Sequence, residues 1–496
     1  PATTLDSRHE SLNRFVQQSP SESYFELEMP KYINFEPMLA KISKVLSVAP
    51  LYAVMKSKPQ HTGDVNHTIL HNKDGQLAWR PHELIHPYIY VKLVHYLTEP
   101  QNWALVQQRF AEFAEDDRIK CISLPVISNS AQSDKAAQIS KWWEDSELGS
   151  LELSLEFDHV LMTDITDCYG SLSTHAVAWA LHGKEYAQSK SGRTDKKLLG
   201  NLLDIGIRST RRNQTNGIPQ SSSLSHLIAE LVLGYADLLL SQVLIEEGYS
   251  DFKILRYRDD YRVFANSQYE CEEIARKISD VLRDFGLKLN PSKTLISDEV
   301  IRAAVKEDKR CRLTAATQPD GLIKHLLLIH DLAYQFPNSG SVARALMEFQ
   351  KEIVGIAGTA ERVGPMVAIL TDIAIHNPRT FSIYASILSR MFTWVRPQER
   401  EGLLENIQTK FESVPHAGQL ELWLQRVAAP FGLNVTYSEP LCDAVVDPEF
   451  QLWNSNWVHV KHRTLLKASE YVDQGVFLAR TPVVQSGEVQ LFHYGS

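Results

Sequence analysis

The segment FKILRYRDDYRVFA, residues 252–265, constrains the fold of this chain more than any other segment does. Two β-rich runs meet at the acidic pair Asp259 and Asp260, and this pattern predicts a β-hairpin with the pair at its apex. Adjacent carboxylates between apolar flanks repel each other and lose hydration unless a cation compensates. A surface Asp-Asp turn is the alternative interpretation, because aspartate is a common turn residue.

A third acidic side chain lies earlier in the chain, at the end of an apolar run. The segment FDHVLMTDI, residues 157–165, predicts a short buried strand with Asp164 near its end. After the hairpin, residues 271–286 predict an amphipathic helix, and Gly286 takes the position of a C-cap glycine. If the three carboxylates converge, two Mg²⁺ ions about 4 Å apart could clamp the reacting oxygens of a phosphoryl transfer.

The second half of the chain has a different pattern, with apolar residues at helical spacing. This spacing predicts five helices joined by short turns, in a bundle or a solenoid-like stack, over residues 341–356, 361–376, 379–394, 399–412 and 418–428. The last segment, residues 436–496, contains Trp453, Trp457 and a strand-like piece at 475–485, and no role follows from it.

Composition and charge limit the functions that remain open. Five scattered cysteines without a CxxC pair argue against a disulfide framework or a zinc site and favour the reducing cytoplasm. The longest apolar stretch, 226–245, is interrupted by Glu230 and Asp237, so we expect a buried helix and no membrane association. The net charge of −9 gives no overall basic footprint. The locally basic run 184–217 could follow a phosphate backbone or form a solvated face.

Four motifs occur in the order of the palm motifs of reverse transcriptases, and through residues 155–300 the chain resembles that family. They are TDITDCYGSL, NGIPQSSSLSHLIAE, RYRDDYRVF and GLKLNPSKT. The resemblance implies that Asp164 and Asp259 bridge two Mg²⁺ ions, with Mn²⁺ as a substitute, and that Asp260 supports them. It also implies that the backbone carbonyl of Ile165 completes the shell of the second ion.

The same resemblance assigns further roles. Tyr169 takes the place of an aromatic steric gate that excludes a 2′-hydroxyl and favours dNTPs, although a core tyrosine fits the sequence equally well. Gln220 would position the incoming nucleotide, and Lys293 would be the acid for the leaving pyrophosphate. Ser221 replaces the usual glycine, and we expect its side chain to lie close to template or nucleotide.

Other segments resemble bacterial abortive-infection and defence-associated reverse transcriptases: MPKYINF, WRPHELIHPYIYVKLV, IKCISLPVIS and SLSTHAVAWALHGKE. That resemblance implies an antiviral role in which DNA is made. The expected fold class is α+β, with right-hand polymerase fingers and palm followed by an all-α helical-repeat-like domain. The expected boundaries are 1–150 for the fingers and N-terminal segment, 151–310 for the palm, 311–435 for the α-helical domain and 436–496 for the C-terminal tail.

The predicted function is therefore RNA-directed DNA polymerisation from dNTPs, with an RNA template or a structured non-coding RNA as partner and DNA as product. The oligomeric state stays open, and a homo-oligomer is allowed. Two other functions also fit the sequence. One is a template-independent, protein-primed nucleotidyl transferase, and the other is a non-catalytic RNA-binding scaffold. An RNA-directed RNA polymerase is a further variant, which nucleotide preference would distinguish.

Overall fold

The computed structural model describes residues 24–72, 79–123, 145–314, 321–356, 362–433 and 435–489. The acidic segment forms the predicted hairpin, with strand β5 (Lys253–Tyr257) antiparallel to β6 (Asp260–Ala265). Strand β4 (His159–Asp164) pairs antiparallel with β6, so the first acidic strand lies beside the hairpin. With β3 (Ile119–Cys121) and β7 (Leu295–Ser297) they form a sheet of order β3-β5-β6-β4-β7.

Two long helices provide much of the core around this sheet. Helix α13 (Gln268–Arg283) begins at Ser267, whose side chain accepts a hydrogen bond from the Glu270 amide, and it buries one apolar face against β4 and β6. Helix α12 (Ser223–Glu246) is long and apolar enough to span a membrane by length and composition. However, 72% of its most apolar window is buried inside the protein, as expected of a core helix.

The N-terminal part surrounds a second, two-stranded sheet. Its elements are α2 (Glu36–Val48), α3 (Leu51–Val54), η1 (Pro59–His61), β1 (His67–Asn72), β2 (Trp79–Leu84), α4 (Pro87–Thr98) and α5 (Pro100–Phe113). Between β4 and α12 the chain forms shorter helices: α7 (Cys168–Ser171), α8 (Ala176–His182), α9 (Lys184–Gln188), α10 (Lys190–Thr194) and α11 (Leu199–Thr210). Most of these elements, though not η1, α9 or α10, share one hydrophobic core with α12 and α13, so the N-terminal part and the sheet region form one body.

The five predicted helices of the second half form a stack with a core of its own, and α16 (Leu322–Gln335), which was not predicted, joins them. The predicted helices are α17 (Gly340–Val354), α18 (Val363–His376), α19 (Phe381–Trp394), α20 (Pro397–Glu412) and α21 (Gly418–Ala428). Helix α19 lies in the middle, in contact with α17, α18 and α21. The short helix η2 (Pro291–Lys293) precedes β7, and after β7 the connection to the stack consists of α14 (Val300–Ala304) and α15 (Glu307–Thr314). This arrangement confirms the predicted α-helical C-terminal region.

The last described segment packs back onto the N-terminal part. Trp453 and Trp457 are buried in the N-terminal core, and the Trp453 Nε1 donates to the Leu84 carbonyl at 3.2 Å. Short helices dominate this segment: α22 (Pro440–Val446), α23 (Val460–Arg463), η5 (Thr464–Leu466), η6 (Ala468–Glu470) and α24 (Gln474–Leu478). The strand-like expectation for 475–485 is therefore wrong at its start, because Asp473 caps α24 by accepting from the Val476 amide at 3.0 Å.

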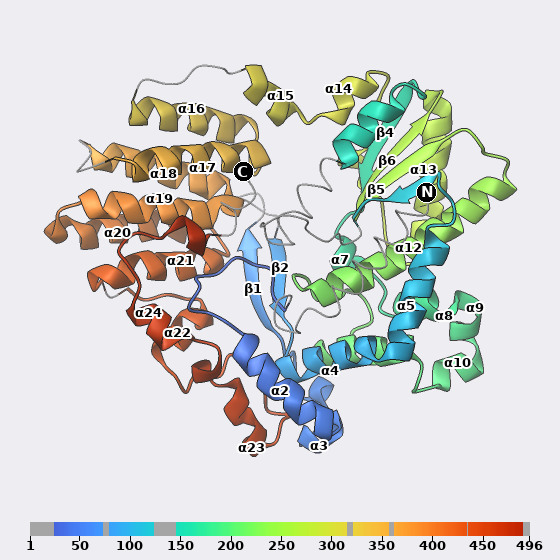
Figure 1. Ribbon diagram of the computed structural model, residues 1–496, viewed down its shortest axis with the longest axis horizontal. Helices are drawn as coiled ribbons and strands as arrows, with labels where there is room; N and C mark the ends of the chain where they lie inside the picture. The colour runs from blue at the N-terminus through green and yellow to red at the C-terminus, as the bar shows by residue number, and fades with distance from the viewer. Residues whose placement is uncertain are drawn as a thin grey trace.

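These parts meet around the β1–β2 hairpin. Figure 1 shows the strands β4 to β6 on one side, the helical stack on the other, and the hairpin between them. The hairpin contacts the stack directly, because His71 forms a β-bridge with Ala417 and the Asn72 side-chain amide donates to the Pro415 carbonyl at 3.2 Å. The helical region is thereby placed close to the acidic hairpin.

Candidate active site

Strand register brings the three predicted carboxylates into one site. Asp164 ends β4 directly opposite Asp260, which begins β6. Asp259 lies in the intervening β5–β6 turn, and its carbonyl accepts a hydrogen bond from the Ile165 amide at 3.0 Å. Residues far apart in the sequence therefore meet because two antiparallel strands are neighbours in the sheet.

The surroundings of these carboxylates disfavour three negative charges at once. Asp164 is 7% exposed, and its Oδ1 has no hydrogen-bond partner among the residues that the structure describes. Burial raises the pKa of Asp259, and the charge of Asp164 adds to this rise. Burial and the neighbouring Asp259 raise the pKa of Asp260 to about 6. A cation would relieve this repulsion.

A divalent cation fits this donor set by its chemistry. Carboxylate oxygens are the ligands that Mg²⁺ prefers, and the unpartnered Asp164 oxygen is a donor of that kind. Within the described ranges, however, no three His, Cys, Asp or Glu side chains are already arranged as a metal-binding cluster. Ile165 is 2% exposed and lies next to Asp164, where its carbonyl was predicted to act as a ligand. Its ligand role stays a prediction.

The raised pKa of Asp260 makes the stability of the metal-free protein depend on pH. The folded state holds its proton up to about pH 6, whereas the unfolded chain releases it near 3.8. Stability therefore falls as the pH rises through this window. In metal-free buffer we expect the stability of Asp260→Asn relative to wild type to increase as the pH rises from about 4 to about 6. This increase should amount to about 1 kcal/mol after solvent screening is allowed for.

Thermal unfolding at several pH values measures this gain. Asp117→Asn is the control, because the Asp117 side chain is 90% exposed on the surface. If the melting temperatures of Asp260→Asn and wild type differ by the same amount from pH 4 to pH 8, Asp260 titrates as an ordinary carboxylate.

Lys293 reaches the same site from η2. Its Nζ forms an ion pair with the Asp164 carboxylate, and its side chain is 57% exposed. The backbone of this segment is tied to β4, because the Asn290 amide donates to the Asp164 carbonyl at 2.8 Å. The structure thus places Lys293 where its ammonium group could meet a substrate phosphate. Its role as an acid stays a prediction.

Tyr169 is held firmly beside the acidic hairpin. Its hydroxyl is hydrogen-bonded to Nδ1 of His226, and the two rings meet edge to face with centroids 5.5 Å apart. The His226 Nε2 lies 2.6 Å from the Glu26 carboxylate. Burial keeps the pKa of Tyr169 well above its ordinary value, so the phenol stays neutral. A fixed ring of this kind suits a steric gate, and it also suits a core tyrosine.

Ser221, which replaces the usual glycine, lies in the loop before α12. Ser221 has φ of 85°, in the left-handed region that favours glycine. Its side chain is 4% exposed and is hydrogen-bonded to Nδ1 of His82 on β2. The expectation that this side chain approaches template or nucleotide is therefore wrong, because the hydroxyl packs inside the protein. Gln220 is anchored next to it, since its carbonyl accepts from the Glu83 amide at 3.0 Å.

Two cationic side chains near the acidic hairpin, Lys306 and Arg379, were not predicted as site residues from the sequence. Lys306 lines a cavity of about 170 Å³ together with Asp164, Asp260 and Lys293. Arg379, in η3 (Pro378–Thr380) of the helical stack, has its pKa lowered by burial and by the charge of Arg80 on β2. No motif marks Arg379 or Lys306, so only the fold could reveal them.

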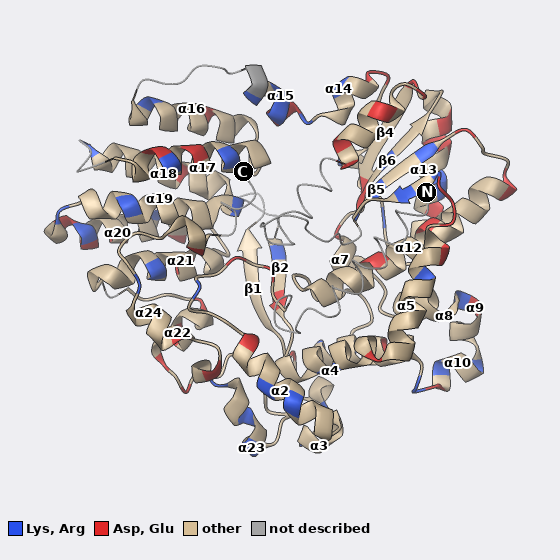
Figure 2. Ribbon diagram, viewed as in Figure 1, with Lys and Arg blue, Asp and Glu red and all other residues tan. Residues whose placement is uncertain are grey.

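The first part of the basic run of residues 184–217, in α9 and α10, lies elsewhere, whereas Arg211 near its end lies 3.8 Å from Glu83 on β2. Figure 2 shows the basic residues of α9 and α10 at the rim of the molecule, away from the β1–β2 hairpin. Part of the run is engaged in ion pairs, with Lys184 2.6 Å from Asp284 and Arg208 3.0 Å from Asp204. A role of this run in nucleic-acid binding stays a prediction.

Comparison with known families agrees with this geometry. Residues 117–310 match the family described as reverse transcriptase (RNA-dependent DNA polymerase). Together with the sheet and the helical stack, this match confirms the predicted fold class of reverse-transcriptase-like fingers and palm followed by an all-α region. The comparison with curated proteins gave no match.

The chain is also similar to solved telomerase structures. Telomerase from Candida albicans with a TWJ fragment of telomeric RNA is 14% identical, with a TM-score of 0.31 over 77% of this chain and 66% of that one. The corresponding Candida tropicalis complex is 12% identical, with a TM-score of 0.32 over 69% and 64%. Apo telomerase from Candida tropicalis is 12% identical, with a TM-score of 0.34 over 83% and 74%. The chain thus spans 66% and 64% of the two RNA-bound telomerases.

Proposed function

We propose that this chain, which carries a reverse transcriptase (RNA-dependent DNA polymerase) domain over residues 117–310, acts as an RNA-directed DNA polymerase that adds dNTPs to a primer. The observation that carries the proposal is the cross-strand pairing of Asp164 with Asp260 beside Asp259. A scaffold without catalysis gains nothing from carboxylates that raise one another's pKa.

The residues of the site divide the work of phosphoryl transfer. Asp164 and Asp259 would hold two Mg²⁺ ions, or Mn²⁺, with Asp260 and the Ile165 carbonyl in support. When bound, the ions would supply activation of the primer hydroxyl and neutralisation of charge on the leaving pyrophosphate. Lys293, beside Asp164, would give a proton or positive charge to that leaving group. Gln220 and Tyr169 would orient the nucleotide and its sugar.

Positive charge around the site supports an anionic substrate. Lys306 shares the cavity of the aspartates, and Arg379 from the helical stack lies within electrostatic reach of Arg80 and Tyr257. Local cations of this kind can bind a triphosphate or a phosphate backbone despite the net charge of −9. The helical region would then take part in substrate binding as well as in the fold.

A direct assay tests the proposal. We expect purified protein with Mg²⁺, a primed RNA template and labelled dNTPs to make DNA whose sequence complements the template. Chelation of the metal by EDTA should abolish synthesis, and added Mg²⁺ should restore it. DNA made equally well without template would favour the template-independent alternative, with the product then attached to a protein tyrosine or to another primer. No synthesis with any dNTP and template would reject the polymerase assignment.

We further propose that this DNA synthesis serves antiviral defence in the bacterial cytoplasm. The support is the resemblance of residues 29–35, 79–94, 119–128 and 171–185 to abortive-infection and defence-associated reverse transcriptases. In that setting a structured non-coding RNA would serve as template or scaffold, and a homo-oligomer is compatible with the proposal.

A further inference from the structure

A cluster of buried charges lies behind the acidic hairpin, between β5 and α12. Arg256 on β5 is 1% exposed, and its guanidinium donates to Asp237 at 2.6 Å and to Glu230 at 2.9 Å. Both carboxylates come from α12 and are buried. A buried ion pair of this kind contributes little net stability, because the desolvation of the charges offsets their attraction. Its presence therefore calls for another explanation.

The cluster forms hydrogen bonds with the backbone of Arg258, the residue that precedes Asp259. The Arg256 Nη1 donates to the Arg258 carbonyl at 3.0 Å, and the Arg258 amide donates to the Ser123 hydroxyl at 2.9 Å. Ser123 in turn donates to Glu230 at 2.5 Å. Both polar backbone groups of Arg258 are thus bound by the same cluster.

Arg258 needs this support because its φ is 51°. That conformation lies in the left-handed region, which side chains larger than glycine rarely adopt, and it persists only where the surroundings impose it. The turn geometry at Arg258 sets the direction in which the next residue, Asp259, leaves the strand. An error here would move a carboxylate out of the position that a pair of metal ions requires.

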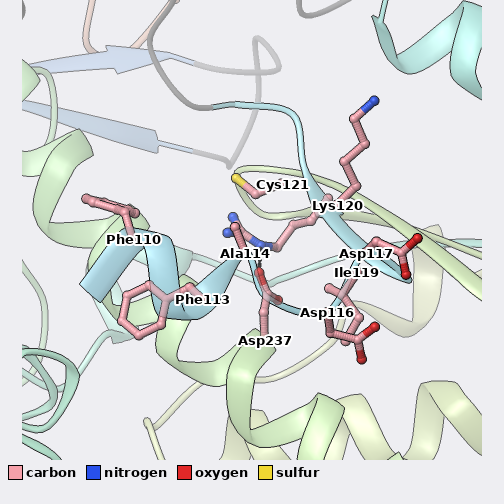
Figure 3. Close-up of a pocket in the computed structure, with 11 residues that line it drawn as sticks. Phe110, Phe113, Ala114, Asp116, Asp117, Ile119, Lys120, Cys121 and Asp237 are labelled. Atoms are coloured by element: carbon pink, nitrogen blue, oxygen red, sulfur yellow. Dashed lines mark hydrogen bonds and ion pairs between the residues drawn. The ribbon is translucent and has the colours of Figure 1, made fainter. Parts of the chain in front are cut away.

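A cavity of about 180 Å³ lies beside the cluster, and Arg256 is among its lining residues. Figure 3 shows Asp237, Cys121, Phe110 and Phe113 in its wall. Asp237 and Arg256 line this cavity, and the guanidinium is held by its hydrogen bonds to Asp237, Glu230 and the Arg258 carbonyl. The backbone position of Arg258 therefore depends on specific donors and acceptors.

We propose that Arg256, Glu230 and Ser123 are positioning residues that hold Arg258 in its left-handed conformation and thereby aim Asp259 at the metal site. The proposal rests on the polymerase function proposed above. It assigns these residues no contact with substrate. They act through the backbone of the turn: Arg256 links α12 to the Arg258 carbonyl, and Ser123 links α12 to the Arg258 amide.

Ser123→Ala and Ser241→Ala make a matched pair of variants. Both serines are buried, and each donates to a carboxylate at 2.5 Å, Ser123 to Glu230 and Ser241 to Asp116. Only Ser123 accepts the Arg258 amide. We expect Ser123→Ala to lower kcat by about 10- to 100-fold with little change in the KM for dNTP, and to bind Mn²⁺ more weakly. Ser241→Ala should keep the kcat of wild type. Ser123→Thr, which keeps a hydroxyl at this position, should have a kcat close to wild type, unlike Ser123→Ala.

Hydrogen exchange gives a readout that needs no activity. In Ser123→Ala the Arg258 amide should exchange faster than in wild type, whereas in Ser241→Ala it should not. Equal kcat, Mn²⁺ affinity and exchange in the two alanine variants would overturn the positioning role. If the wild type itself makes no DNA, the polymerase proposal fails, and Mn²⁺ affinity and exchange still decide whether Ser123 positions the turn.

Discussion

Asp259→Asn is expected to reduce nucleotide incorporation on the order of 10³-fold or more while leaving the protein folded. The substitution removes the charge that Asp259 contributes between Asp164 and Asp260, and a neutral amide is a poor ligand for two Mg²⁺ ions. The fold should tolerate it well, because burial already raises the pKa of Asp259 and so penalises the charged form. We expect metal-free Asp259→Asn to melt at the same temperature as wild type or higher.

Primer extension with and without Mn²⁺ measures this loss, and thermal unfolding measures the fold. Asp167→Asn is the matched control: it makes the same chemical change in the same motif, at a residue with φ of 45° that asparagine also adopts. Protection of bacterial cells from phage should be lost in Asp259→Asn and retained in Asp167→Asn. Normal incorporation by Asp259→Asn would remove this residue from the catalytic set.

Tyr169→Val is expected to reduce the preference for dNTPs over rNTPs by about 10- to 200-fold. If Tyr169 is the steric gate, its ring, held by His226, would leave no space for a 2′-hydroxyl, whereas the shorter valine would leave that space. The magnitude follows from the free energy that a pocket gains or loses with one small group. The ratio of kcat/KM for a dNTP and its rNTP counterpart is the measurement.

Tyr169→Phe separates the gate from the core interpretation. Phenylalanine keeps the ring and loses only the hydrogen bond to His226, so discrimination should stay within a few-fold of wild type while the melting temperature falls slightly. If Tyr169→Val also discriminates like wild type but melts at a much lower temperature, Tyr169 is a core residue and another group sets the sugar preference.

Local patterns were sufficient to predict much of this fold. Strand β4, the β5–β6 hairpin and helix α13 follow from short-range alternation, helical spacing and turn residues, and the stack of helices follows from apolar periodicity. The convergence of Asp164 with Asp259 and Asp260 was expected from the order of four motifs, and strand register then provides the geometry.

The remaining features depend on contacts between distant segments. Nothing near Arg379 in the sequence indicates that the helical stack brings it within electrostatic reach of Arg80. The sequence shows only that Ser221 departs from the motif, whereas the structure shows that its hydroxyl is hydrogen-bonded to His82. A strand was predicted at the start of 475–485 because valine, phenylalanine and leucine are common in strands. The segment forms a helix instead, and Asp473 caps it.

The docking of the last segment has a consequence for how the protein is made. Phe35 packs against Trp453 and Tyr471, with ring centroids 6.0 and 5.3 Å apart, so its core is assembled from segments far apart in the sequence. During synthesis the residues around Phe35 must wait, with apolar surface uncovered, until Trp453 and Tyr471 have left the ribosome. Newborn chains of this protein should therefore depend on chaperones, and a prematurely terminated one should aggregate.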